Sequence, residues 1–121
     1  MTVSEERERL AAQTARNIEG LELEREGQIE AALALYQRNI DDGFEGDWPY
    51  GRLVATYEKR GELERAVAVL ERAIEVFGAS KRRTPADRRS TINAFKGRLR
   101  LVRKAIRERD RPPRRPRRGA G

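Results

Sequence analysis

The chain has 121 residues, 37% hydrophobic and 39% charged, which is enough for one small domain. It contains no cysteine and no histidine, which excludes disulfides, thiolate nucleophiles, cysteine-based zinc sites and the commonest general base. No apolar run is long enough to cross a bilayer and the acidic N-terminus is unlike a secretory signal, so we expect a cytoplasmic protein with no membrane partner.

The formal net charge of +7 is unevenly distributed along the chain. Residues 1–80 hold 10 basic and 17 acidic residues, whereas residues 81–121 hold 17 basic and 3 acidic residues. The first part therefore carries a formal charge of −7 and the second a formal charge of +14. Such asymmetry favours a polyanionic partner, or a contact between the two parts.

The first expected helix covers residues 3–26 and the second covers residues 28–42. Thr2 and Glu5 have capping-box spacing at the start of the first helix, and Gly27 separates the two. The apolar residues of the first helix follow a helical period, namely Leu10, Ala11, Ala15, Ile18 and Leu21 or Leu23. The second helix presents one apolar face, formed by Ile29, Ala32, Leu33, Tyr36 and Ile40.

Glycines, a proline and several aspartates predict a loop before the third helix. Asp47 is the expected N-cap, Pro49 lies in the first turn, and Gly61 ends the helix. Trp48 falls in the loop, where it either packs the loop against the helices or remains exposed as a binding anchor. The third helix buries Tyr50, Leu53, Val54 and Tyr57, and the fourth, residues 62–77, buries Leu63, Ala66, Val67, Leu70, Ala73 and Ile74.

A fifth helix is expected to begin at Pro85 and run to about Asp110. Thr84 is its N-cap and Asp87 follows three residues later. One apolar stripe runs along it, formed by Ile92, Phe95, Leu99, Val102 and Ile106. Residues 111–121 contain three prolines, five arginines and two glycines, so we expect this tail to be disordered.

Gly27 and Gly61 lie 34 residues apart, and their surroundings repeat at the same step: Ala32 with Ala66, Tyr36 with Leu70. This chain therefore resembles the tetratricopeptide repeat (TPR) family, and residues 31–77 are similar to short bacterial members. The resemblance implies an all-α fold, a right-handed α-solenoid fragment with two TPR-like hairpins in residues 1–79. Residues 80–110 would then form a basic capping helix on these repeats, and the protein would be a non-enzymatic interaction adaptor without cofactor or metal.

The first repeat copy departs from the family pattern at Arg16, Glu19 and Asn39. Some TPR domains bind chaperone peptides through lysine and asparagine on the inner face, but the matching residues here are Asn17, Leu21, Gly51 and Ala55. The resemblance therefore does not support chaperone-tail binding. A peptide groove is still implied, lined by Asn17, Leu21, Glu24, Trp48, Gly51, Ala55, Glu58 and Lys59, unless the fifth helix fills it.

The basic part of the chain suggests two alternative functions. One is non-specific nucleic-acid binding by residues 81–118, without the interleaved aromatic residues that stack on bases. The other is a homodimer in which the apolar stripes of two helices 85–110 pair. A solvated tail, or pairing with the acidic part of a neighbouring copy, also accounts for the charge. The candidate polyanion-binding residues are Arg82, Arg83, Arg88, Arg89, Arg100, Arg103, Lys104, Arg107, Arg114, Arg115, Arg117 and Arg118.

Overall fold

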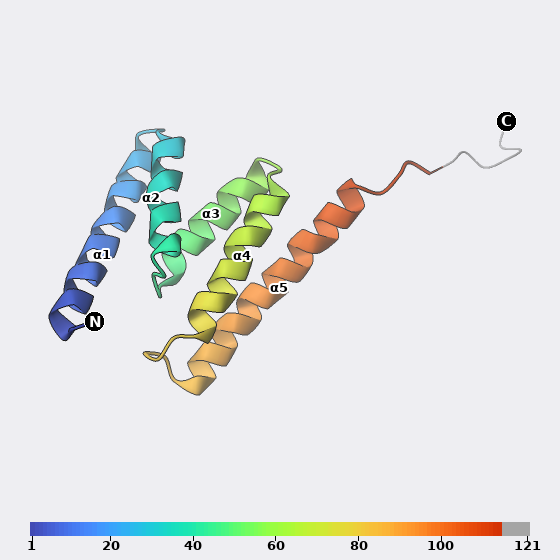
Figure 1. Ribbon diagram of the computed structural model, residues 1–121. Helices are drawn as coiled ribbons and strands as arrows, with labels where there is room; N and C mark the ends of the chain where they lie inside the picture. The colour runs from blue at the N-terminus through green and yellow to red at the C-terminus, as the bar shows by residue number, and fades with distance from the viewer. Residues whose placement is uncertain (115–121) are drawn as a thin grey trace, which may run out of the picture.

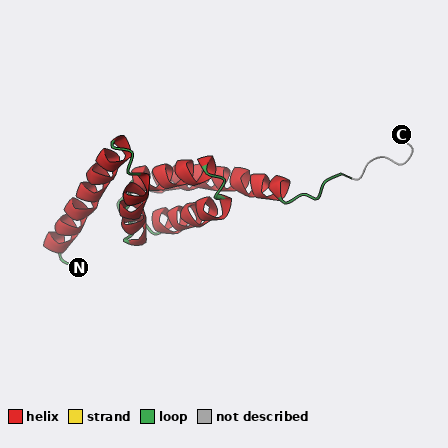
Figure 2. Ribbon diagram, turned by 90° about the horizontal axis from the view of Figure 1, so that it is seen from above, coloured by secondary structure: helices red, strands yellow, loops and turns green. Residues whose placement is uncertain are grey.

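The computed structural model of the chain describes residues 1–114 (Figure 1). This part is all-α and contains no strand. Its helices are α1 (Val3–Arg25), α2 (Ile29–Asp41), α3 (Asp47–Lys59), α4 (Leu63–Gly78) and α5 (Pro85–Arg109). Each helix packs mainly on its neighbours along the chain, so α1 and α5 form the two ends of the array (Figures 1 and 2).

The predicted caps of α1 and α5 are confirmed. The Thr2 hydroxyl accepts a hydrogen bond of 3.1 Å from the Glu5 N–H, and the Thr84 hydroxyl accepts one of 3.2 Å from the Asp87 N–H. These bonds satisfy N–H groups that have no partner inside the helix.

The predicted N-cap of α3 is wrong by one residue. Gly46 is the N-cap, with an extended backbone at φ −113° and ψ 153°, and Asp47 is the first helical residue. There the Asp47 carboxylate lies in the first turn, where the helix dipole favours negative charge. As a consequence, Trp48 belongs to α3 and does not lie in the loop.

Gly27 and Gly61 end α1 and α3 by the same backbone turn. Their φ angles are +78° and +74°, a left-handed conformation that residues with a Cβ adopt only with strain. In both turns the residue after the glycine donates its N–H to the carbonyl five residues earlier, at 2.8 Å. The repeated glycine in the sequence thus corresponds to a repeated turn in the structure.

The core lies where α2, α3, α4 and α5 meet. Every predicted core residue of α3 is buried, as are Ala32, Leu33, Tyr36 and Ile40 of α2. The rings of Tyr50, Phe77 and Phe95 pack together, with centroids 5.2–6.1 Å apart, and so join α3, α4 and α5. The predicted face of α4 omits three residues that the structure buries: Val69, Val76 and Phe77.

The apolar stripe of α5 packs inside the chain. Leu99 and Val102 are buried, and Ile92, Phe95 and Ile106 pack against the core at partial burial. The apolar stripe that would pair two copies in a homodimer therefore covers α4 within one copy.

Most apolar residues of α1 do not form its buried side, which corrects the simplest interpretation of their period; of the residues in that period, Leu23 packs against the core at partial burial. Leu10 and Ile18 are 42% and 56% exposed. The side that meets α2 carries Gln13 and Gly20, both buried, and partly buried Asn17. The reason is one buried polar residue of α2: the Asn39 amide donates at 2.8 Å to the Gln13 carbonyl and to Asn17 Oδ1.

Residues 111–114 follow α5 without regular structure. The remainder of the expected disordered tail, with Arg115, Arg117 and Arg118, lies outside the described residues.

Candidate interaction surfaces

Four of the predicted groove residues are exposed on α3. Trp48 is 44% exposed, and Gly51, Ala55 and Lys59 are also exposed. Leu21 of α1 is half-buried. We call these five residues the α1–α3 face.

Glu24 was also predicted to line the groove, but the structure uses it to join α1 to α3. Its carboxylate accepts hydrogen bonds from the Tyr36 hydroxyl at 2.6 Å and from Arg52 Nε at 3.2 Å, and pairs with the second guanidinium nitrogen of Arg52. The hydrogen bond from Arg52 is the largest cause that lowers the pKa of Glu24 below its ordinary value of 4.5. Glu24 is therefore an internal contact between the two hairpins.

Two further predicted groove residues have internal partners. Glu58 pairs with Arg98 of α5, and Asn17 accepts the hydrogen bond from Asn39. Both side chains therefore already make contacts inside the chain.

Trp48 lies at the junction between the hairpins. The Arg52 guanidinium is 5.9 Å from the indole centroid, and the indole is near the Tyr36 hydroxyl. Burial raises the pKa of Tyr36 to about 12, and its hydrogen bond to Glu24 acts in the same direction. Arg52 was missed as a site residue, although its position four residues after Trp48 places both on one side of a helix.

The fifth helix does not fill the α1–α3 face. It packs chiefly on α4. A Cβ added at Gly51 would meet no atom within 4 Å, so the middle of this face is open.

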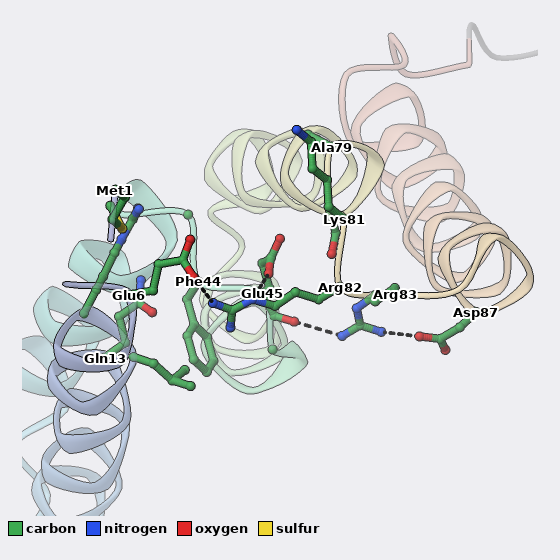
Figure 3. Close-up of a pocket in the computed structure, with 15 residues that line it drawn as sticks. Met1, Glu6, Gln13, Phe44, Glu45, Ala79, Lys81, Arg82, Arg83 and Asp87 are labelled. Carbon is green, nitrogen blue, oxygen red and sulfur yellow. Dashed lines mark hydrogen bonds and ion pairs between the residues drawn. The ribbon is translucent and has the colours of Figure 1, made fainter. Parts of the chain in front are cut away.

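Arg82 and Arg83, two of the predicted polyanion-binding residues, lie beside a cleft of about 720 Å³ (Figure 3). The cleft separates the start of α1 from the α2–α3 and α4–α5 loops. Arg83 is largely buried: it donates to the Glu45 carbonyl at 2.9 Å, pairs with Asp87 at 3.2 Å, and lies 4.5 Å from the Phe77 ring centroid. This arginine holds the two loops together.

Arg82 makes looser contacts. It is 3.6 Å from a Glu45 carboxylate oxygen and 3.9 Å from one of Glu6 (Figure 3). Acidic and basic side chains alternate around the cleft and largely neutralise each other, so it does not form a concentrated anion site.

The basic residues of α5 divide into two groups. Some have acidic or buried surroundings: Arg103 is 3.8 Å from Glu71, Lys104 is 4.0 Å from Glu108, and Arg88 is half-buried with a 3.4 Å contact to the Arg83 carbonyl. Arg89, Arg100 and Arg107 are exposed and have no ion pair within residues 1–114. Arg114 is exposed beyond the end of the helix.

Within the described part of the chain, no cluster of three or more acidic residues is placed to hold a metal ion. No helix of residues 1–114 is long and apolar enough to cross a membrane.

Comparison with protein-family models, with curated proteins and with solved structures finds no match for this chain.

Proposed function

We propose that this protein is a TPR-like helical scaffold that binds a segment of another protein and has no catalytic role. Support comes from the two hairpins, which repeat both the glycine turn and a fully buried alanine, Ala32 in one and Ala66 in the other. Small residues at such positions let the helices of a hairpin approach closely. Arrays of this kind present extended surfaces for protein partners.

The exposed indole of Trp48 carries the proposal. A helical tryptophan that is 44% exposed, beside an open glycine and an exposed alanine, forms a shallow apolar surface with one large anchor. Tryptophan is enriched among residues that dominate binding energy. Gly51 and Ala55 leave room for the backbone of a bound peptide, and the Arg52 guanidinium lies over the indole, 5.9 Å from its centroid.

Pull-down from cell lysate tests this proposal with three tagged proteins in parallel: wild type, Trp48→Ala and Leu101→Ala. Leu101 is the matched control, because it is 60% exposed on α5, away from the α1–α3 face. We expect proteins enriched by the wild type and by Leu101→Ala to be lost with Trp48→Ala. Titration of an identified partner should then shift the fluorescence of Trp48. Equal enrichment by all three proteins would contradict the proposal.

Nucleic-acid binding is a second candidate, favoured by the exposed Arg89, Arg100 and Arg107 of α5. Phosphate contacts of this kind do not depend on base sequence and weaken steeply with salt. A band-shift titration with DNA and with RNA, at low and at physiological salt, tests it. The absence of any shift at low salt would rule this function out, whereas a shift that survives deletion of residues 111–121 would assign binding to α5.

A further inference from the structure

The two ends of the helical array carry opposite charge. On α1 and its C-cap residue Glu26, the exposed glutamates Glu5, Glu8, Glu19, Glu22 and Glu26 follow at steps of 3, 11, 3 and 4 residues. These steps are close to whole helical turns, so the carboxylates share one side of the helix. We call them the acidic face. Between the glutamates lie three exposed small residues, namely Ala11, Ala12 and Ala15.

The acidic face forms no ion pair in the part of the chain that the structure describes. Within residues 1–114, none of its carboxylates lies within 4.0 Å of a basic group. Glu6 and Glu24, which do have arginine partners, lie on other sides of α1. Like charges at steps of three and four residues repel each other along a helix, and the ion pairs that α1 forms within residues 1–114 involve none of these glutamates.

The exposed side of α5 has the complementary pattern. Arg89, Lys96, Arg100, Arg103 and Arg107 follow at steps of 7, 4, 3 and 4 residues and are all exposed. We call them the basic face. Among these five residues only Arg103 has an ion-pair partner within residues 1–114, at 3.8 Å from Glu71. The basic face lies beside the apolar stripe of α5 and stays uncovered by α3 and α4.

The two faces also match in length and position. Helix α1 has 23 residues and α5 has 25, which makes them the two longest helices of the described chain. They form the opposite ends of the array, as Figure 1 shows. A face at one end cannot meet the face at the other end within one copy without unpacking the helices between them.

We propose that copies of this chain associate head to tail, with the basic face of α5 in one copy against the acidic face of α1 in the next. The contact is heterologous, because the two copies contribute different surfaces, and it therefore produces open chains or closed rings of copies. The small residues of the acidic face allow the incoming helix to approach closely. The contact leaves the α1–α3 face free, so this proposal does not depend on the proposed peptide binding.

A second copy is favoured over a nucleic acid because its acidic face is opposite in charge to the basic face and lies on a helix of similar length. Binding of a second copy and binding of a nucleic acid would both weaken as salt is added, since mobile ions screen charges over about 10 Å at 0.1 M salt. The experiment must therefore use charge reversal as well as salt.

Two charge-reversal variants and their mixture test the proposal. One is Glu19→Arg with Glu22→Arg, the other is Arg100→Glu with Arg107→Glu. All four side chains are exposed and without ion pairs in residues 1–114, so circular dichroism should show unchanged helix content. The molar mass of nucleic-acid-free protein is then measured by sedimentation and light scattering across a concentration series, at low and at high salt.

We expect the wild type to increase in mass with concentration at low salt and to return to the monomer at high salt. Each variant alone should remain a monomer, because the altered acidic face then carries three glutamates and two arginines, and the altered basic face three basic residues and two glutamates, so neither keeps a strong charge of one sign. An equimolar mixture should regain mass, because the unaltered basic face of the first variant can then meet the unaltered acidic face of the second. A wild type that is monomeric throughout, whether or not it binds an added DNA duplex, would overturn the proposal. So would variants that associate like the wild type, or a mixture that remains monomeric.

Discussion

Gly20 of α1 and Gly51 of α3 both lie inside helices, but the first is closely packed and the second faces open space. A Cβ on Gly20 would lie 2.5 Å from Tyr36 Cε1, whereas a Cβ on Gly51 would meet nothing within 4 Å. We expect Gly20→Ala to lower the free energy of unfolding by about 1–3 kcal/mol through overpacking. Gly51→Ala should raise it by roughly 0.5–1 kcal/mol, because alanine favours the helix. Urea denaturation measures both, and destabilisation by Gly51→Ala would contradict an open α1–α3 face.

Glu24 predicts a dependence of stability on pH. Its pKa is lower in the folded chain than the ordinary 4.5, mainly because of the hydrogen bond from Arg52. The ionised carboxylate therefore stabilises the fold fully above that ordinary value, and this contribution is lost as the pH falls through the lowered pKa. In Glu24→Gln the loss on acidification should be smaller than in the wild type.

The measurement for Glu24 is the difference in unfolding free energy between the wild type and Glu24→Gln, followed downwards from neutral pH. Glu8→Gln is the control, because Glu8 is exposed and has no ion pair in residues 1–114. A difference that stays constant with pH would show that the contact with Arg52 does not depend on the charge of Glu24.

At the level of elements, α5 is a cap on α4. Leu99 is 7% exposed within the core cluster, whereas Leu101 is 60% exposed on the same helix. We expect Leu99→Ala to cost about 2–5 kcal/mol, the usual range for a buried leucine. Leu101→Ala should change stability by less than about 0.5 kcal/mol. Thermal unfolding compares the two, and equal effects would mean that the stripe of α5 does not pack as described.

Helix α1 shows why an apolar period does not by itself identify the buried side of a helix. The period of Leu10, Ala15 and Ile18 indicated a helix correctly. The packed side was decided by α2, whose buried Asn39 requires hydrogen-bond partners and whose Tyr36 requires the space at Gly20. Buried polar groups are stable only when their hydrogen bonds are satisfied, so a polar residue on one helix selects polar residues on its neighbour.

At the level of the whole molecule, Arg83 ties the α4–α5 loop to the α2–α3 loop. It donates to the Glu45 carbonyl and lies over the Phe77 ring, while the adjacent Arg82 is 56% exposed and forms only long ion pairs. We expect Arg83→Ala to lower the unfolding free energy by roughly 1.5–3 kcal/mol. Arg82→Ala should cost roughly 0–1 kcal/mol. Chemical denaturation distinguishes them, and equal losses would exclude this role for Arg83.

The candidate sites were predicted less completely than the helices. Trp48, Gly51, Ala55 and Lys59 are exposed on one helix, as the repeat spacing indicated. Glu24 and Glu58 instead form ion pairs between helices, and their partners Arg52 and Arg98 are 28 and 40 residues away in the sequence. Such pairs depend on how helices are placed side by side, which a local pattern does not contain.

The sequence by itself determined the helices and the turns between them. Helix period, the capping threonines and the glycines Gly27 and Gly61 act over a few residues, so their effect is visible in a short stretch of sequence. Only the tertiary structure decided which side of α1 is buried, which arginines hold the loops together, and that the acidic and basic faces lie at opposite ends. Those outcomes depend on contacts between residues far apart in the chain, where packing space and charge partners are set by the whole array.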